Sequence, residues 1–498
     1  MGSPELLAAS EISTHKTSDD CWIVVGGNVW DVTDFAPTHP GGEAIILRYG
    51  GRDATAAYSA IHAPSIIKEG LPPTAFKGTL DLSTVTDSWS RPLKAESPRS
   101  TPSALSEKPA LESRINADDF ELAAKAYAPA KTWAFYSSAD TDLVTLTANR
   151  TLYSRIWFRP RILRKVSEVS TATSMLGVPC MMPLMVSPAG MARLIHPQGE
   201  LALAGGCAAK NIIQCIATTA SYSATEIAAV APEHSFFFQL YVDRNRSKSE
   251  ALLRKLQEAA PNVKAVFITV DAAATGKREA DERLKADESY SSPMIKNKAK
   301  NDRRGGGIAR IMGNFIDPAL SWDDVAWARR ATHLPLLLKG VMCADDVKMA
   351  FEHGLDGVLL SNHGGRNLDT SPPAILVLLE CHRRIPEIFS AKTPRGNKFE
   401  IHIDGGIRRG TDILKCLCLG ATAVGMGRSF LFATGYGQEG VEHLIDILED
   451  ELKVAMANVG ISSLAEVGPH LVNTGDIDHL IPQSASHPYA QDFRKSKL

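Results

Sequence analysis

The sequence lacks several features that define common classes of protein. It contains no apolar run long enough to cross a membrane, and its first residues carry no apolar segment of the secretory type. Positive charge is not in excess, since 54 Lys and Arg residues face 56 Asp and Glu residues. A chain without a basic surplus is not expected to bind nucleic acid or an anionic membrane surface. We therefore predict neither nucleic acid nor a membrane as a partner.

Cysteine is scarce, and the spacing of the cysteines does not indicate a disulfide framework. Eight cysteines are spread over 498 residues without a CxxC pair, which predicts buried thiols in a reducing compartment rather than disulfides. Also missing is a GxGxxG motif followed by an acidic residue, and this argues against a Rossmann site for NAD. With 44% apolar residues, the chain can bury at least one large core, and its length favours two or more domains.

A change in composition divides the chain. Residues 83–113 are rich in Ser, Pro and charged residues and have no sustained apolar period, which is typical of a linker. We therefore predict a small domain over residues 5–82 and a large domain over residues 114–475, with a polar tail over residues 476–498.

The tail ends in Ser496, Lys497 and Leu498. This tripeptide is a peroxisomal targeting signal when it forms the free carboxyl terminus. The alternative is that it occurs by chance on a polar tail. The predicted location is the peroxisome, with the import receptor as a partner, and otherwise the cytoplasm.

The small domain contains two histidines that could face each other. His39 stands in the turn sequence HPGG, and His62 follows a second helical stretch in SAIHAP. A turn histidine alone is more often simply solvated, but two neutral imidazoles across a cleft can occupy both axial positions of a haem iron. The preceding hairpin, with Gly26 and Gly27 between apolar strands, would supply walls for that cleft.

With these motifs, residues 5–82 resemble a cytochrome b5 domain, an α+β fold. The resemblance implies that the module binds haem b with His39 and His62 as axial iron ligands. Modules of this kind carry single electrons, so a redox partner is expected, namely the large domain.

The large domain alternates apolar strand-like segments with helical patterns. Examples are VKAVFITVD, which ends at Asp271, LPLLLKGV with Lys339, and FEIHIDGG with Asp404. Near-continuous apolar strands separated by helices predict a parallel sheet, and the length suits a (βα)8 TIM barrel. For the helix over 411–420, Thr411 is the predicted N-cap and Gly420 the predicted end. Polar residues at strand ends should line the site.

Two glycine turns that carry arginine lie one βα unit apart. The first is DGGIRRG with Arg408, and the second is GMGR with Arg428. Glycine lets backbone N–H groups approach a phosphate closely, and the loops after the last strands are where barrels bind phosphate. Glycine turns alone are common in α/β proteins, but this pair predicts a phosphorylated cofactor.

The stretch SNHGGRNLD places His363 and Arg366 directly after the apolar strand GVLL. As an isolated pair they could be a structural histidine and a solvated charge. At the end of a barrel strand, Arg366 can bind a carboxylate while His363 reaches the adjacent hydroxyl or carbon, and Asp271 can stabilise the imidazolium.

Together, SNHGGRNLD, TVDAAATGKRE, LLKGV, HIDGGIRRGTD and GMGR resemble the motif set of the FMN-dependent 2-hydroxy-acid oxidising family. With the haem module, the chain resembles the flavocytochrome b2 type of that family, L-lactate dehydrogenase (cytochrome). The resemblance implies that His363 is the general base with Asp271 as its partner, that Arg366 and Arg278 bind the substrate carboxylate, and that Tyr241 bonds the substrate hydroxyl. It implies FMN contacts from Ser187, Pro188, Ala189, Gly190, Gln239, Thr269, Lys339, Asp404, Gly405, Gly406, Ile407, Arg408, Gly427 and Arg428.

The implied reaction is oxidation of a small, lactate-like (S)-2-hydroxy acid to the 2-oxo acid, with electrons passing from FMN to haem b and onward to an acceptor, which is a cytochrome or oxygen. Two alternatives stay open: a peroxisomal oxidase that gives electrons to oxygen and forms hydrogen peroxide, and a haem and flavin carrier without catalysis. Whether the α-hydrogen leaves as a proton or as a hydride is also open. The resemblance further implies a homotetramer.

The sequence departs from the family pattern at several positions. Phe135 replaces a usual tyrosine that helps to bind the substrate carboxylate, and Ala139 replaces a usual glycine. Losing one hydrogen bond to a charged group removes about 1.5–3 kcal/mol. Gly190, Thr219 and Ala217 replace a common alanine, leucine and serine near the flavin. These changes leave open which 2-hydroxy acid is the substrate.

A basic and glycine-rich stretch, KNKAKNDRRGGG, covers residues 296–307. It is predicted to be a mobile lid or loop near the mouth of the barrel.

Overall fold

The protein was analysed as a computed structural model that describes residues 5–39, 43–59, 66–86, 108–285 and 315–482, with single positions 62, 89, 307, 308 and 313. Several predicted features lie wholly or partly outside these residues. They are the PGG part of the HPGG turn, most of the linker 83–113, the loop 296–307 apart from Gly307, and the terminal Ser496, Lys497 and Leu498.

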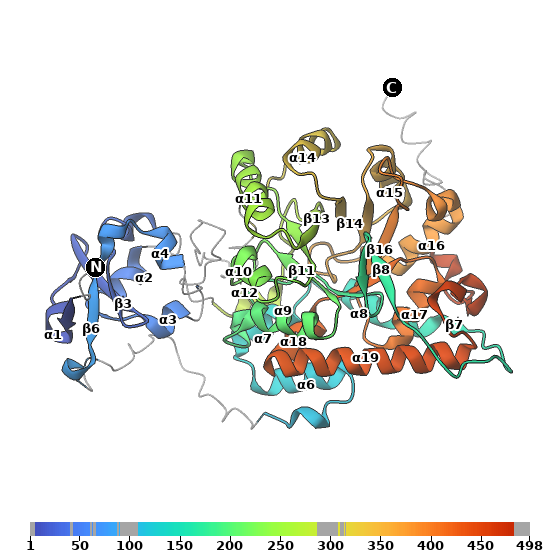
Figure 1. Ribbon diagram of the computed structural model, residues 1–498. Coiled ribbons are helices and arrows are strands. Elements are labelled where there is room, and N and C mark those ends of the chain that lie inside the picture. The colour runs from blue at the N-terminus through green and yellow to red at the C-terminus, as the bar shows by residue number, and fades with distance from the viewer. Residues whose placement is uncertain are drawn as a thin grey trace.

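The small domain is built on a six-stranded sheet (Figure 1). Strands β3 (Asp20–Val25) and β4 (Asn28–Asp31) form the predicted hairpin. Its turn residues Gly26 and Gly27 both have positive φ, a conformation that glycine adopts without a Cβ penalty. The remaining strands are β1 (Leu6–Ala8), β2 (Lys16–Thr17), β5 (Arg52–Asp53) and β6 (Phe76–Asp81).

Short helices pack on both faces of this sheet. They are α1 (Ala9–Ile12), η1 (Ala36–Thr38), α2 (Glu43–Arg48), α3 (Thr55–Ser59), α4 (Ile66–Gly70), η2 (Pro73–Ala75) and η3 (Leu82–Thr84). On one face, α2 and α4 cover an apolar cluster that includes Ile23, Trp30, Ile46 and Leu71. On the other face, α1 packs through Ile12 in a second cluster with Val24 and Val29.

The large domain is a closed barrel of eight parallel strands, as predicted. Closure is shown by the last strand pairing with the first, where Met185 lies opposite Gly425. The strands are almost wholly buried and apolar because helices cover the barrel outside and side chains fill it inside. They are β10 (Leu184–Val186), β11 (Ile213–Ala217), β12 (Phe236–Leu240), β13 (Val263–Thr269), β14 (Leu336–Val341), β15 (Gly357–Leu360), β16 (Glu400–Asp404) and β17 (Ala423–Met426).

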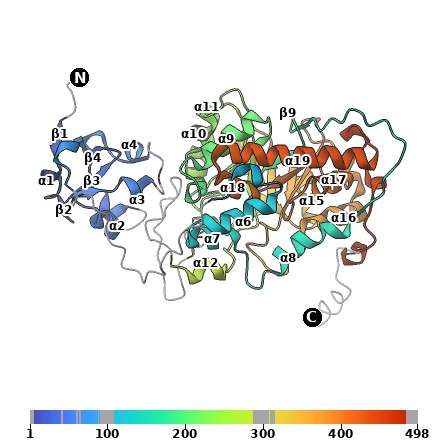
Figure 2. The same cartoon turned by 90° about the horizontal axis from the view of Figure 1, so that it is seen from below.

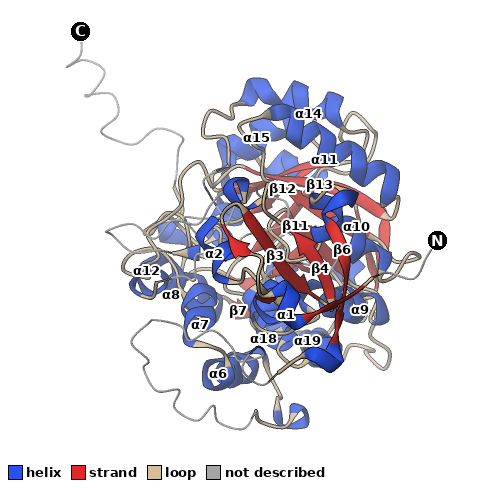
Figure 3. Ribbon diagram, turned by 90° about the vertical axis from the view of Figure 1, so that its left-hand side faces the viewer, coloured by secondary structure: helices blue, strands red, loops and turns tan. Residues whose placement is uncertain are grey.

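Helices surround the barrel (Figure 3). Following the strands are α9 (Gly199–Ala209), α10 (Ala224–Ala229), α11 (Arg246–Ala259), α12 (Glu279–Arg283), α14 (Val325–Ala331), α15 (Ala344–Glu352), α16 (Ala374–Arg384), α17 (Gly410–Cys418), α18 (Arg428–Thr434) and α19 (Gly437–Val459). Before the barrel come α6 (Ala117–Tyr127), α7 (Ala130–Ser137) and α8 (Val144–Thr151). Helix α18 packs between α6 and the long α19 on one side of the barrel (Figures 1 and 2).

Two small sheets complete the large domain. The hairpin of β8 (Thr173–Met175) and β9 (Val178–Cys180) packs into the barrel interior with the buried side chains of Met175 and Cys180. Strand β7 (Trp157–Phe158) pairs with β18 (Val472–Asn473), and Ile477 and Ile481 beyond it are also buried in the core.

One predicted helix boundary is wrong by two residues. Helix α17 has Arg409 as its N-cap, and Thr411 lies inside its first turn. Asp412 occupies the third helical position and accepts the backbone N–H groups of Arg408 and Arg409, so the carboxylate stabilises the helix start in place of the threonine. Gly420 follows the helix with a φ of +93°, as expected for a residue that ends a helix.

Two expectations from composition can be checked on the described residues. None of their helices combines the length and apolar character needed to span a bilayer. Seven of the eight cysteines are buried, and Cys343 is partly buried. Burial raises the pKa of the Cys215 and Cys416 thiols, so both stay protonated at neutral pH.

Candidate functional site

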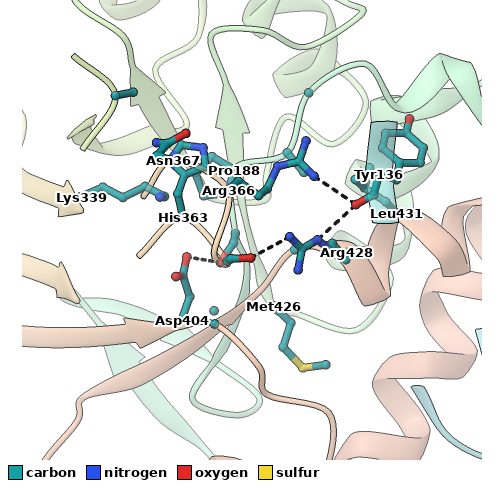
Figure 4. Close-up of a pocket in the computed structure, with 18 of the residues that line it drawn as sticks. Tyr136, Pro188, Lys339, His363, Arg366, Asn367, Asp404, Met426, Arg428 and Leu431 are labelled. Atoms are coloured by element: carbon teal, nitrogen blue, oxygen red, sulfur yellow. Dashed lines mark hydrogen bonds between the residues drawn. The ribbon is translucent and has the colours of Figure 1, made fainter. Parts of the chain in front are cut away.

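A cavity opens at the carboxyl ends of the barrel strands, and most of the predicted site residues line it. Figure 4 shows Lys339, His363, Arg366, Asp404 and Arg428 arranged around one space. The predicted residues that line the cavity are Ser187, Pro188, Ala189, Gly190, Tyr241, Arg278, Lys339, His363, Arg366, Asp404, Gly405, Gly406, Ile407, Arg408, Gly427 and Arg428.

His363 is held in an unusual backbone conformation. The φ angles of His363, Gly364 and Gly365 are +58°, +65° and +75°, so the chain makes three successive left-handed residues directly after β15. Glycine adopts this conformation freely, whereas histidine does so at some cost, which is typical of functional sites. The Ser361 hydroxyl accepts the backbone N–H of His363, and the resulting turn directs the imidazole into the cavity.

The imidazole of His363 lies between a carboxylate and a phenol. Its Nδ1 atom is 2.9 Å from Asp271 Oδ1, and its Nε2 atom is 3.3 Å from the hydroxyl of Tyr241. Asp271 does not line the cavity itself and acts through His363. With Nδ1–H donating to the carboxylate, Nε2 is the ring nitrogen that is left to accept a proton.

Burial and neighbouring charges determine the protonation states of His363 and Asp271. Desolvation lowers the pKa of His363, and the neighbouring Lys339 lowers it further, while Asp271 acts in the opposite direction. Burial alone would raise the pKa of Asp271, but its interaction with the His363 ring, including their hydrogen bond, and the charge of Lys339 outweigh burial and hold that pKa below its usual value. At neutral pH the site therefore contains a neutral imidazole beside a carboxylate, which is the state required of a general base.

Two arginines, the buried Arg278 and the half-buried Arg366, face the histidine. Arg366 Nη1 donates to the backbone carbonyls of Phe135, Tyr136 and Ser138 at 2.9–3.1 Å, and its guanidinium lies 5.3 Å from the ring centre of Phe135. Arg278 donates Nε to the carbonyl of Arg366 itself. Desolvation and the charge of Arg278 lower the pKa of Arg366 well below its usual value. A bound carboxylate would relieve this repulsion, so the pair fits an anionic substrate.

Lys339 and Asp404 form the floor of the cavity. Lys339 is 4% exposed, and its ammonium donates to the Ser361 hydroxyl at 3.1 Å. Burial alone would lower the pKa of Lys339, but Asp271 and Asp404 outweigh burial and raise it. Asp404 Oδ2 accepts the hydroxyl of Ser187 at 3.0 Å, which links the loop after β10 to the end of β16.

Several guanidinium groups lie close together around Arg428 in the cavity. Desolvation and the charges of Arg150, Arg278 and Arg408 lower the pKa of Arg428 to about 9. Arg408 is partly compensated by ion pairs with Asp118 and Glu121 of α6. Such a cluster of guanidinium groups is the donor set that binds phosphate.

The polar groups and glycines of the cavity fit FMN. Asp404 Oδ1 is buried without a hydrogen-bond partner, so it is available for a ligand hydroxyl. A Cβ atom at Gly406 would lie 1.9 Å from the carbonyl of Asn149, and one at Gly425 would lie 2.2 Å from the hydroxyl of Ser187. Gly406 thus lets the loop after β16 approach α8, and Gly425 lets β17 approach the segment after β10.

Gln239 and Thr269 are placed differently from the other predicted flavin contacts. Both are buried, and Gln239 Nε2 donates to the Thr269 hydroxyl at 2.8 Å. Gln239 Oε1 accepts the backbone N–H of Thr218. Neither residue lines the cavity, and their contact with FMN stays a prediction.

The small domain brings its two histidines together. The ring centres of His39 and His62 are 6.3 Å apart. Iron–nitrogen bonds of about 2 Å on either side of a haem iron place two axial imidazole centres about 6 Å apart. Burial, His39 and Arg193 lower the pKa of His62 to about 3, so its imidazole is neutral, as a metal ligand must be. The pair therefore fits haem.

The sequence interpretation missed part of the cavity. Leu146 and Arg150 of α8 line it, as do Thr275, Ile316 and Asn367. No motif marks Arg150, because it lies on a helix that precedes the barrel, and only folding brings it beside Arg428. A basic residue on the inner face of that helix was the one available signal.

Comparisons with known proteins agree with this geometry. Residues 124–474 match the family described as FMN-dependent dehydrogenase, and residues 8–81 match the Cytochrome b5-like Heme/Steroid binding domain. The chain is 39% identical to an L-lactate dehydrogenase (cytochrome) of Wickerhamomyces anomalus over 97% of this chain and 83% of that protein. It is 35% identical to a peroxisomal (S)-2-hydroxyacid oxidase of Arabidopsis thaliana, over 72% of this chain and 96% of the oxidase.

A solved structure shows the same fold. A double mutant of flavocytochrome b2 with pyruvate bound is 37% identical to the chain and superposes with a TM-score of 0.65. The match covers 78% of this chain and 92% of that structure.

Arg428→Gln is expected to weaken FMN binding by about 10- to 100-fold, because one charge-assisted hydrogen bond to phosphate is lost. Riboflavin, which lacks the phosphate, should bind the variant and the parent chain equally. Equilibrium dialysis of the flavin-free protein measures both affinities. Arg409→Gln is the control, since Arg409 pairs with Glu451 outside the cavity, and equal losses for FMN and riboflavin would contradict the phosphate role.

Proposed function

Because the chain belongs to the FMN-dependent dehydrogenase family and carries a cytochrome b5-like domain, we propose that it oxidises a small (S)-2-hydroxy acid of the lactate class to the 2-oxo acid. FMN and haem b are its cofactors. The observation that carries the proposal is one cavity in which a neutral histidine paired with a carboxylate faces two arginines.

Each residue around the substrate has a distinct role. Arg366 and Arg278 bind the carboxylate of the substrate, and Tyr241 forms a hydrogen bond with the hydroxyl group of the substrate. His363 Nε2 takes up one of the two protons that oxidation releases, and Asp271 stabilises the imidazolium that results. When bound, FMN accepts the two electrons, and haem b passes them on one at a time.

Lys339 acts on the charge of the cofactor. Its ammonium is buried, paired with Ser361 and kept protonated by Asp271 and Asp404. A fixed cation in a site of low dielectric stabilises negative charge that develops nearby, and this effect is often the largest in catalysis. We assign Lys339 to stabilising the reduced, anionic flavin.

The two candidate enzymatic functions differ in the final electron acceptor. The histidine pair of the small domain favours a dehydrogenase that delivers electrons to a cytochrome. An oxidase that uses oxygen is the second candidate, since a relative that spans most of the large domain is named as one. A non-catalytic carrier is disfavoured because the base and both arginines are in place.

Two further features belong to the proposal. Where Leu498 is the carboxyl terminus, Ser496, Lys497 and Leu498 direct the protein to the peroxisome through the import receptor. The quaternary state is a homotetramer.

The peroxisomal address is tested by expressing the full chain in cells with and without these three residues. The intact chain should show a punctate distribution in the cell, and the shortened chain a diffuse one. Identical distributions would contradict the address.

The function is tested by spectroscopy without oxygen. Addition of lactate, glycolate, mandelate and longer 2-hydroxy acids in turn should bleach the flavin and then shift the haem Soret band, because both cofactors receive electrons. Flavin bleaching without haem reduction, followed by peroxide on aeration, would identify the oxidase instead. A spectrum that none of these acids changes would refute the enzymatic proposal.

The pairing of His363 with Asp271 predicts a specific pH dependence. The neutral imidazole is the active form, so kcat/KM should be constant above the pKa of His363 and fall below it, and burial lowers that pKa from its usual value. Asp271→Asn removes the charge that raises this pKa. The acid limb should therefore move to lower pH, while the plateau falls by about 100-fold or more.

The pH profile of kcat/KM, measured with an artificial acceptor, checks this prediction. Asp323→Asn is the matched control, because Asp323 is exposed on η7 (Trp322–Asp324), away from the cavity. An acid limb that stays in place or moves upward in Asp271→Asn would show that His363 is not the titrating base.

A further inference from the structure

We propose that Arg193 docks the haem-binding domain on the barrel by binding the backbone carbonyl of His62, and so controls how fast electrons reach the haem. The inference rests on the proposed function, because it concerns the step between the two cofactors. It assigns a positioning role to a residue outside the cavity.

Arg193 lies where the two domains meet. It belongs to the short helix η6 (Ala192–Leu194), directly after the segment 187–191 that lines the cavity. Its Nη1 atom donates a hydrogen bond to the carbonyl oxygen of His62. Figures 1 and 2 show helices α3 and α4, which flank His62 in the chain, on the side of the small domain that faces the barrel.

The barrel holds this arginine in place. Its Nε atom donates to the carbonyl of Pro197 at 3.2 Å, and its guanidinium lies 5.2 Å from the ring centre of Tyr222. The Tyr222 hydroxyl donates to the same Pro197 carbonyl at 3.0 Å. The side chain is thus oriented by groups of the barrel alone, so that little conformational freedom is lost when the small domain binds.

A buried carboxylate fixes the backbone around Arg193. Glu200 Oε1 accepts the N–H groups of Ala192 and Ser221, both at 2.9 Å, and the backbone N–H of Arg193 donates to the Ser221 hydroxyl. A Cβ atom at Gly199 would lie 2.8 Å from Arg193 Cγ. These contacts join η6 to the loop after β11 and keep the arginine in one position.

On the other side, the bonded carbonyl belongs to an axial-ligand residue. The His62 ring faces His39, and the Tyr58 ring packs against it at 4.9 Å between centres. The Tyr58 hydroxyl accepts the backbone N–H of Ile67 in α4. Arg193 therefore binds the haem domain at the segment that carries the iron ligand.

The contact also gives a short route between the two cofactor sites, made of covalent bonds and one hydrogen bond. Met191 lines the cavity, and two peptide units lead from it to Arg193, whose side chain reaches His62 through one hydrogen bond. A second contact between the domains, Lys255 with Glu69 at 3.7 Å, joins two side chains that are more than half exposed. Exposed ion pairs contribute little. Ile66 of α4 packs against the apolar core of the large domain, so among the described residues Arg193 adds a directional polar contact to this apolar one.

Arg193→Gln in the full chain tests the proposal. Stopped-flow mixing with substrate under anaerobic conditions follows the flavin and haem bands separately. Flavin reduction should stay within about twofold of the parent, whereas haem reduction should slow by about tenfold or more, as expected for loss of a charge-assisted hydrogen bond. Arg193→Lys, which keeps the charge but not the Nε bond to Pro197, should give an intermediate rate.

A second measurement does not depend on turnover. Hydrogen–deuterium exchange of the full chain should show faster exchange in residues 55–70 and 191–200 of Arg193→Gln than in the parent, because the docked state is less populated. Tyr222→Leu removes the ring that orients Arg193 while keeping the arginine, and it should shift both readouts in the same direction by less. It also provides a test if Arg193→Gln does not fold.

Control variants distinguish a wrong docking role of Arg193 from a wrong proposed function. Lys255→Ala should leave both rates within about twofold, as expected for an exposed pair, and a loss equal to that of Arg193→Gln would overturn the specific role of Arg193. Unchanged haem reduction and exchange in Arg193→Gln would overturn the docking role, as would a changed spectrum of the oxidised haem, which would indicate altered ligand geometry. A parent flavin that no substrate bleaches would instead refute the proposed function.

Discussion

The site depends on positive charge gathered around one cavity. Arg278, Lys339, Arg366 and Arg428 line this cavity, and nearby carboxylates, namely Asp140, Asp271, Asp281 and Asp404, offset their charge only in part. Burying cations in this way is costly unless anions accompany them. The proposed chemistry supplies three: the substrate carboxylate, the phosphate of FMN and the charge of the reduced flavin. The cavity is therefore organised for ligands that the chain does not itself contain.

The segment before the barrel holds these cations in position. Arg366 and Arg428 come from different barrel loops, yet both donate to the carbonyls of Tyr136 and Ser138 at the end of α7. Asp369 accepts the backbone N–H groups of Val144 and Thr145 at the start of α8. The N-terminal helices thus form one wall of the site, and the arginines keep their geometry before any ligand binds. The same wall contains Phe135, so a change in substrate preference at that position is consistent with the packing.

Much of this site could be predicted because its residues follow directly from strands. Asp271, Lys339, His363 and Asp404 stand at or just after the ends of apolar segments, and parallel strands bring those ends to one face of a barrel. Arg150 could not be predicted, because it lies on α8, outside the repeating βα pattern. The start of α17 was misplaced because the capping preference of Thr411 competed with that of Asp412, and only the packed backbone decides between them.

The sequence by itself determined the alternation of strand and helix, the two-domain organisation and the chemical types of the site residues, because these depend on local periodicity and short motifs. The tertiary structure alone decided other contacts. It joined Arg408 to the acids of α6 and brought Arg193 to the carbonyl of His62. The partners in each of these contacts are far apart in the chain, so no local pattern can encode them, and only closure of the barrel and docking of the small domain bring them together.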